Sequence, residues 1–214
     1  MNKRPVASVC RVATAALALM AICGCSALSP STTPPPSYYS LNRLPGAVAL
    51  AAPAAAPTLI INPPQAAAGF DSARIIYLRE QHKLEYFAHG EWVDPPPHML
   101  GDLLVAALEQ SGAFRAVLLA PSAAVGDLRL DTEIIRLQHE FETRPSRVRF
   151  TLRATLVDDK TRRVLATREF DDSSAAASDD TYGGVVAANR AVQTVLERLS
   201  LFCAEAARNA RAEK

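Results

Sequence analysis

The clearest pattern of hydrophobic and polar positions lies in the second half of the chain. Apolar residues occupy every second position from Val148 to Leu156, and polar residues fill the positions between them. Val157, directly after this segment, is also apolar. A period of two places alternate side chains on opposite faces of an extended strand. One face of this strand is therefore expected to be buried and the other solvated, as in an antiparallel sheet. Residues 158–161 predict a hairpin loop into a further strand over Arg163–Phe170.

A longer strand is predicted immediately before this one. Leu128, Leu130, Thr132 and Ile134 share one parity, whereas the apolar positions from Ile135 onward have the other parity. A slip of one residue turns the packed side chains to the opposite face. We therefore expect a bulge, or a change of buried face, at residues 134–135.

Shorter apolar runs predict strands nearer the N-terminus. They are Tyr38–Leu41, Thr58–Ile61, Arg74–Leu78, Lys83–Phe87 and Phe114–Leu118. The run at Thr58–Ile61 is continuous and is stopped by Asn62-Pro63-Pro64, which is typical of a strand buried on both faces. Residues 79–82 and 89–91 are expected to form turns.

Two segments have helical spacing. The first runs from Met99 to Gln110 and should end at Gly112 as a left-handed cap. The second runs from about Tyr182 to Arg208, after a polar loop over residues 171–180. Its apolar stripe is Val185, Ala188, Val192, Val195, Leu196, Leu199, Phe202 and Cys203. Strands, a helix, a run of strands and a long helix predict an α+β fold, a mostly antiparallel sheet with two principal helices on one face.

The first 24 residues differ in character from this domain. Lys3, Arg4 and Arg11 precede an uncharged run that ends in Ile22-Cys23-Gly24-Cys25. The run is shorter than the roughly 20 residues of a membrane-spanning helix, and its length suits a signal peptide. It resembles a lipobox, so we expect residues 1–24 to be removed and Cys25 to carry the lipid. The alternatives are a plain secretory signal and a short buried helix.

Lipidation would define the organisation of the mature chain. We expect diacylglycerol and an N-linked acyl chain such as palmitate on Cys25, and no other cofactor. Ser26, which follows the cysteine, favours export to the periplasmic face of the outer membrane. Residues 25–37 are rich in Ser, Thr and Pro and are expected to form an extended tether. Residues 38–208 would then form the folded domain, and residues 209–214 a disordered tail.

Composition narrows the classes of function. The chain has 23 basic and 22 acidic residues, and without residues 1–24 it keeps 20 basic and 22 acidic residues. A slightly acidic domain gives no electrostatic reason to expect nucleic-acid binding or adhesion to anionic lipid. Hydrophobic residues make up 49% of the chain, which excludes a disordered protein.

No catalytic motif is recognisable in the chain. There is no glycine-rich phosphate loop, nucleophile elbow or His-x-x-x-His pair, so we expect no enzyme and no metal site. Glu80, His82 and His89 have no metal-ligand spacing and are interpreted as strand surface. The aspartates of residues 171–180 match no calcium loop. Cys203 would be the single cysteine of the domain and is expected to be a buried thiol.

Two sets of residues are candidates for contact with a partner. Trp92 with Pro95, Pro96 and Pro97 could form a recognition surface, because exposed aromatic residues mark interfaces. The alternative is that these residues are packing elements. Arg147, Arg149 and Arg153 lie on the outward face of one strand and could bind lipid phosphate or an acidic partner. The alternative is an ordinary solvated face, paired with neighbours such as Glu169.

Several of these features together resemble the ABC-type transport auxiliary lipoprotein family. Its members accompany MCE-domain intermembrane lipid transporters and include the lipoprotein of the paraquat-inducible intermembrane transport system. The matching features are the lipobox at Cys25, Tyr38-Tyr39-Ser40-Leu41, the hairpin from Ile75 to Tyr86, Trp92-Val93-Asp94-Pro95, Gly112-Ala113-Phe114, the long strand from Leu128, the hairpin through Asp158-Asp159 and the last helix.

This resemblance implies a non-enzymatic accessory that docks a lipid transporter to the outer membrane. Its partners would be an MCE-domain periplasmic protein with an inner-membrane permease and ATPase. Because MCE proteins form rings, the resemblance is also compatible with a homo-oligomer. The alternative function is an outer-membrane assembly or chaperone lipoprotein for lipopolysaccharide or secretion machinery.

Overall fold

The computed structural model describes residues 35–42 and 51–212. The chain divides into two units, Met1–Pro35 and Pro36–Lys214, and the second unit holds the domain described below. Cys25 and the predicted signal peptide lie outside the described residues. None of the described helices is both long enough and apolar enough to cross a membrane.

The described part of the second unit contains nine strands and two helices. In chain order they are β1 (Ser37–Tyr39), β2 (Thr58–Ile61), β3 (Gln65–Ala66), β4 (Arg74–Leu78), β5 (Glu85–Trp92), α2 (Pro96–Gln110), β6 (Ala116–Leu119), β7 (Leu128–Glu140), β8 (Arg147–Asp158), β9 (Val164–Ala175) and α3 (Thr181–Ala212). The α+β fold class predicted from the sequence is confirmed.

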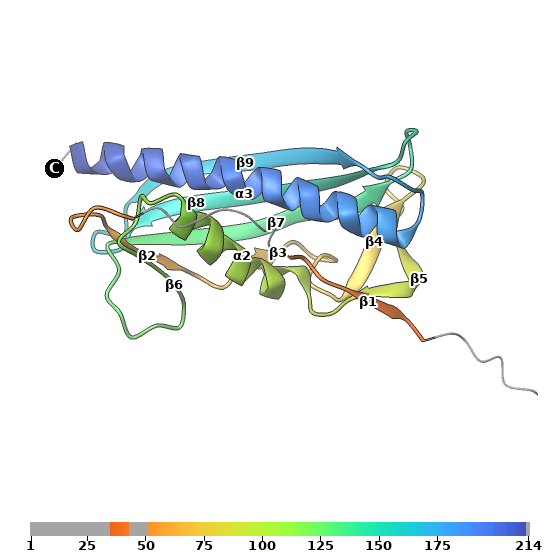
Figure 1. Ribbon diagram of the computed structural model, residues 1–214, viewed down its shortest axis with the longest axis horizontal. Helices are drawn as coiled ribbons and strands as arrows, with labels where there is room; N and C mark the ends of the chain where they lie inside the picture. Colours follow the sequence, from red (N-terminus) through yellow and green to blue (C-terminus); the bar gives the residue numbers. More distant parts are fainter. Residues whose placement is uncertain (1–34, 43–50, 213–214) are drawn as a thin grey trace, which may run out of the picture. The chain divides into compact units, whose positions relative to one another are not determined.

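Three long antiparallel strands form the larger part of the sheet (Figure 1). β7 pairs with β8 along its whole length, and β8 pairs with β9. The alternation predicted for β8 is confirmed, because Val148, Phe150, Leu152, Ala154 and Leu156 are all buried. The predicted bulge is also confirmed, because the register between β7 and β8 shifts between Ile134 and Arg136.

The other edge of β7 pairs with three short strands in succession. β2 lies beside its first residues, β3 beside its middle and β4 beside its last residues, all parallel to β7. β6 extends the sheet beyond β2, while β5 and then β1 extend it beyond β4. The hairpin of β4 and β5 is antiparallel, as expected from the turn at residues 79–82. A hydrophobic pattern indicates which face of a strand is buried but not which strand lies next to it, so the parallel pairings with β7 were not predicted.

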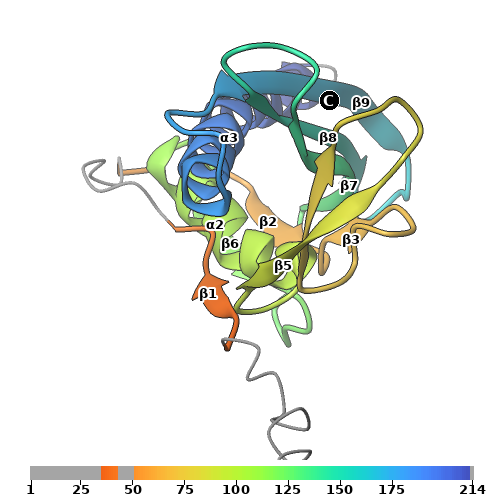
Figure 2. The ribbon, with the colours of Figure 1, turned by 90° about the vertical axis from the view of Figure 1, so that its right-hand side faces the viewer.

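Both helices pack on one side of this sheet, as predicted, and the strands curve around them in the view of Figure 2. α3 contacts β7, β8 and β9, and α2 contacts β2, β3 and β6. The largest fully buried side chains include Leu59, Ile61, Leu100, Leu104, Phe150, Phe170 and Leu199, which come from both helices and from both halves of the sheet. Gly112 ends α2 with a φ of 62°, as the left-handed cap predicted for it requires.

Two predicted strand ends differ by five residues from the structure. The turn expected at residues 89–91 is instead part of β5, which continues to Trp92. Gly90 within it packs so closely that a Cβ atom there would lie 2.5 Å from Thr181 Cγ2, so this glycine serves packing rather than a turn. β9 continues to Ala175, five residues beyond the expected end, because residues 171–175 stay in register with β8 despite their polar side chains.

The helices are longer than the sequence predicted. α2 begins at Pro96 rather than Met99, since proline is well tolerated in the first turn, where its missing N–H would have no partner. α3 continues to Ala212, so residues 209–212 of the expected disordered tail are helical. Arg211 donates a hydrogen bond of 2.7 Å to the carbonyl oxygen of Ala55, which ties this last turn to the start of the domain.

Candidate functional site

The proposed recognition surface at the end of β5 is largely buried. Trp92 is 3% exposed and belongs to the hydrophobic core, so it is not the exposed aromatic residue that the recognition-surface hypothesis requires. Its side chain points inward because it shares the face of Tyr39, its partner in β1, which also packs on the core. Pro96 and Pro97 are buried in the first turn of α2, and Pro95 is half-buried. The structure thus favours the packing interpretation.

The three arginines of β8 lie together, but carboxylates and backbone oxygens surround them. Arg153 contacts Glu133 on β7 at 3.0 Å and Glu169 on β9 at 3.2 Å, so the pairing with Glu169 is confirmed. Arg149 Nε lies 3.9 Å from a carboxylate oxygen of Glu140 and 3.8 Å from one of Asp171.

Arg147, the third member, donates hydrogen bonds to the hydroxyl and the carbonyl oxygen of Ser173. The stripe therefore belongs to a network within the sheet, which favours the solvated-face interpretation over an anion site. The acids on β7 that complete the network come from a strand whose pairing with β8 the sequence did not specify.

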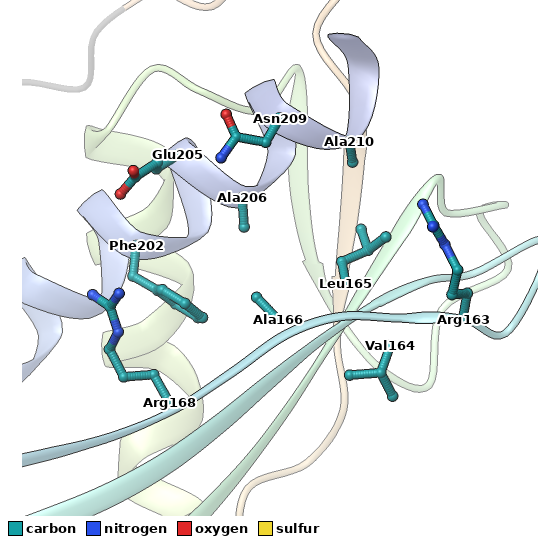
Figure 3. A pocket seen from close by; sticks show the side chains of 10 residues that line it. All are labelled: Arg163, Val164, Leu165, Ala166, Arg168, Phe202, Glu205, Ala206, Asn209 and Ala210. Atoms are coloured by element: carbon teal, nitrogen blue, oxygen red, sulfur yellow. The ribbon is translucent and has the colours of Figure 1, made fainter. Parts of the chain in front are cut away.

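A groove lies between the first half of β9 and the second half of α3 (Figure 3). Its volume is about 370 Å³, which is within the range of small ligand sites. Both apolar and polar side chains line it. The lining residues are Arg163, Val164, Leu165, Ala166, Arg168, Phe202, Glu205, Ala206, Asn209 and Ala210.

The sizes of the side chains on α3 explain why the groove opens where it does. Toward the middle of the helix, Arg198 donates a hydrogen bond of 3.0 Å to the carbonyl oxygen of Asp171 on β9. Phe202 then packs edge-on against Phe170, with 5.7 Å between the ring centres. Beyond Phe202 the helix presents only Ala206 and Ala210 toward β9, and these are too short to fill the space. The sequence did not predict this groove, because alanines at helical spacing are typical of a helix face that packs on a core.

A second polar cluster lies at the other end of α3. Ser146 Oγ donates a hydrogen bond to Asp179 Oδ1, and it lies 2.8 Å from His139 Nε2. Since the serine proton is directed to the carboxylate, His139 Nε2–H is the donor to Ser146. The opposite arrangement, with histidine accepting the serine proton, is what nucleophilic catalysis requires. The cluster therefore does not form a catalytic triad.

The surroundings of His139 are typical of a structural role. Burial lowers the pKa of His139, and its Nδ1 has no hydrogen-bond partner among the described residues. A Cβ atom on Gly184 would lie 2.5 Å from that nitrogen, so the histidine leaves no room for a ligand there. Asp180 accepts a hydrogen bond of 2.7 Å from the Gly183 N–H and caps the first turn of α3.

The remaining candidates for chemistry are metal-ligating side chains and the thiol of Cys203. Within residues 35–42 and 51–212 there is no group of three or more His, Cys, Asp or Glu side chains that could hold a metal ion. Cys203 is buried, as predicted, and burial raises the pKa of its thiol to about 12. A thiol with that pKa is unreactive at neutral pH, because the thiolate is the nucleophilic form.

Comparison with known proteins identifies the class to which this fold belongs. The model of the family described as ABC-type transport auxiliary lipoprotein component matches residues 39–200. The match spans most of the chain and nearly all of the domain, and the chain therefore belongs to this family. The family consists of lipoproteins that serve as accessory components of transport. No curated protein matches the chain.

Solved structures share the fold. A crystal structure of a protein from Xanthomonas campestris superposes with a TM-score of 0.71 and 24% sequence identity, covering 82% of this chain and 99% of that chain. A crystal structure of an uncharacterized protein gives a TM-score of 0.62 at 14% identity, with 79% and 99% covered. At these identities the likeness establishes the fold alone.

Proposed function

We propose that this protein is the outer-membrane-anchored accessory component of an ABC/MCE-type intermembrane phospholipid transport system. In this role it docks the periplasmic part of the transporter to the outer membrane. The observation that carries the proposal is the family match over residues 39–200, which starts where the Pro-rich segment ends. The partners are an MCE-domain periplasmic protein, an inner-membrane permease and an ATPase.

The anchor and the tether set the position of the domain in this proposal. Acyl chains on Cys25 hold the protein in the membrane, since each buried CH₂ contributes about 0.8 kcal/mol and several chains together give a stable anchor. Residues 26–36 hold four prolines and continue into β1 at Ser37. At about 3 Å per residue for an extended Pro-rich chain, these eleven residues can hold the domain roughly 30 Å from the lipid.

The chemistry of the domain supports a role in binding rather than in catalysis. Its one histidine–serine contact has the wrong donor direction for a nucleophile, and its one cysteine is a buried thiol of high pKa. Among the described residues, the groove between β9 and α3 offers an open surface. An accessory that acts by contact needs such a surface and no reactive group.

Replacement of the two neighbouring cysteines tests the anchor. Cys25→Ala should leave the protein unlipidated and remove it from the outer-membrane fraction of the native host, whereas Cys23→Ala, its matched control, should fractionate like the wild type. Chemical crosslinking of intact envelopes, followed by mass spectrometry, should join the wild-type protein to the MCE-domain protein. If Cys25→Ala remains in the outer membrane, the anchor is wrong.

The same crosslinking distinguishes the alternative role. An outer-membrane assembly or chaperone lipoprotein would be joined to lipopolysaccharide or secretion machinery and not to a lipid transporter. Deletion of the gene should then disturb assembly of those components and leave phospholipid transport between the membranes unchanged. Either result would overturn the proposed function.

A further inference from the structure

β9 is the edge strand of the long antiparallel half of the sheet. It pairs with β8 on one side, and no described strand pairs with its other side. An edge of this kind presents a row of unpaired N–H and C=O groups, which is a template for pairing with another chain. Natural proteins usually protect such edges against pairing with another chain, so an unprotected stretch is a candidate binding site for one.

The second half of β9 is protected by two arginines. Arg198 on α3 donates a hydrogen bond to the carbonyl oxygen of Asp171, and Arg147 donates one to the carbonyl oxygen of Ser173. In an antiparallel ladder, backbone groups alternate between the two edges, so residues two apart face the same edge. The capped carbonyls of Asp171 and Ser173 therefore mark the outer edge of β9.

The first half of the strand lacks this protection. By the same alternation, the N–H and C=O groups of Thr167 and Glu169 face the outer edge, and no described residue outside the sheet bonds to them. An irregularity in the register between Leu156 and Val157 ends the regular ladder near Leu165. The open stretch is thus residues 166–170, five residues long.

The open stretch lies beside the groove. Ala166 and Arg168 belong to both features, and Phe202 and Ala206 on α3 line the opposite side of the groove (Figure 3). An edge strand next to a helix, with a hollow between them, is the arrangement that binds extended peptides by strand addition. Main-chain hydrogen bonds provide affinity, and alternate side chains of the peptide enter the hollow.

The charge at this place indicates which peptide would fit. Arg168 lies 4.7 Å from the centre of the Phe202 ring and has no ion pair with a described residue. Arg153 on the neighbouring strand, by contrast, has carboxylates on both sides. Glu169, next to Arg168, is already engaged by Arg153. A carboxylate on the incoming chain could form an ion pair with Arg168.

From these observations we infer that residues 166–170 of β9 accept an extended segment of a partner polypeptide as an additional strand, with an apolar side chain in the groove and a carboxylate near Arg168. This inference rests on the proposed function in one respect: the segment belongs to the periplasmic part of the transporter. The mode of binding follows from the edge and the groove themselves.

Two substitutions at one residue test the main-chain bonds. Thr167→Pro removes an N–H that faces the outer edge, where proline is tolerated in strands. Thr167→Ala keeps that N–H and, like Thr167→Pro, loses the 3.1 Å contact between the Thr167 and Thr155 hydroxyls. In crosslinked envelopes containing the full-length lipoprotein, Thr167→Pro should lower recovery of the MCE-domain protein about tenfold, whereas Thr167→Ala should leave it within about twofold.

A filled groove gives an independent variant. Ala206→Trp places a large side chain in the hollow and should lower the same recovery, whereas Leu201→Trp, at an exposed position outside the groove, should not. Thermal unfolding of each purified variant checks that the fold is kept. Amide hydrogen exchange should show protection of residues 166–170 in the wild-type lipoprotein only when the transporter is bound.

The outcomes separate this inference from the proposed function. If the wild type recovers the transporter and Thr167→Pro does so equally well, strand addition at β9 is overturned and the docking role stands. If the wild type recovers no transporter component, the proposed function fails. If the amides of residues 166–170 become protected from hydrogen exchange as the concentration of the lipoprotein alone is raised, β9 pairs with a second copy of the chain. That result would overturn the inference. Loss of co-purified phospholipid in Ala206→Trp but not in Thr167→Pro would assign the groove to lipid and would also overturn it.

Discussion

The two ends of α3 face the same sheet but differ in how tightly they pack against it. At the first turns, Gly184 brings the helix backbone so close to the sheet that a Cβ atom there would lie 2.5 Å from His139 on β7, and the buried His139 and Ser146 form a hydrogen-bonded chain with the exposed Asp179 beside it. In the last turns, Ala206 and Ala210 stand over an open groove. The close end holds the fold together, whereas the loose end leaves a surface on which another molecule can bind.

The largest effect should come from one methyl group at the close end. Gly184→Ala would place a Cβ atom 2.5 Å from His139 Nδ1. Overpacking of this kind costs about 1–3 kcal/mol, and we expect the upper part of that range because a buried ring must move. The higher helix propensity of alanine, worth about 1 kcal/mol, should offset only part of this cost.

Urea unfolding of the purified domain measures this difference in the free energy of unfolding. Ala206→Leu at the loose end is the matched control, because it adds three carbons where the groove has room. Its free energy of unfolding should stay within about 0.5 kcal/mol of the wild type. If Ala206→Leu were as destabilising as Gly184→Ala, the distinction between the two ends would be wrong.

A somewhat smaller effect is expected from Ser146→Ala. Ser146 is 1% exposed, and its removal leaves His139 Nε2–H buried without its partner. An unsatisfied buried group costs about 1–3 kcal/mol, and the lower half of this range is expected because Asp179 can turn to solvent. Ser178→Ala removes an exposed hydroxyl that bonds to Asp180 and should cost much less. Equal losses in the two variants, measured by thermal unfolding, would contradict a special role for the buried hydroxyl of Ser146.

The smallest expected effect is the dependence of stability on pH. Burial lowers the pKa of His139 below its ordinary value of 6.5, so the unfolded chain takes up a proton before the folded domain does. Stability should therefore be full above pH 6.5 and fall as the pH drops from there toward the lowered pKa of the folded domain. The pKa values of Asp179 and Asp180 are also lowered, chiefly by the hydrogen bonds from Ser146 and from the Gly183 N–H, which adds a further loss below about pH 4.

Urea titrations at a series of pH values can assign the first of these losses to His139. His139→Gln should flatten the slope just below pH 6.5, whereas His98→Gln, a change at an exposed histidine, should keep it. An unchanged slope in His139→Gln would show that another group titrates with unfolding.

Local pattern predicted the long strands of the antiparallel half because the information lies within each strand. The alternation in β8 and the parity change at Ile134–Ile135 depend on residues next to one another, and both were confirmed. The parallel pairing of β7 with β2, β3 and β4 joins segments up to about 70 residues apart, and their sequences do not specify their neighbours. The place of Trp92 stayed open between core and binding surface for a related reason, since an aromatic residue before a proline run is typical of both.

The sequence by itself determined the fold class, the buried faces of the long strands, the two helices and the family, because each depends on periodicity or on the order of motifs along the chain. Only the tertiary structure decided that the arginines of β8 are engaged, that Trp92 is core and that β9 has an open stretch beside a groove. Charge neutralisation, burial and an unpaired strand edge are properties of distances between segments remote in the chain. They exist only once the long strands, α2 and α3 have packed together.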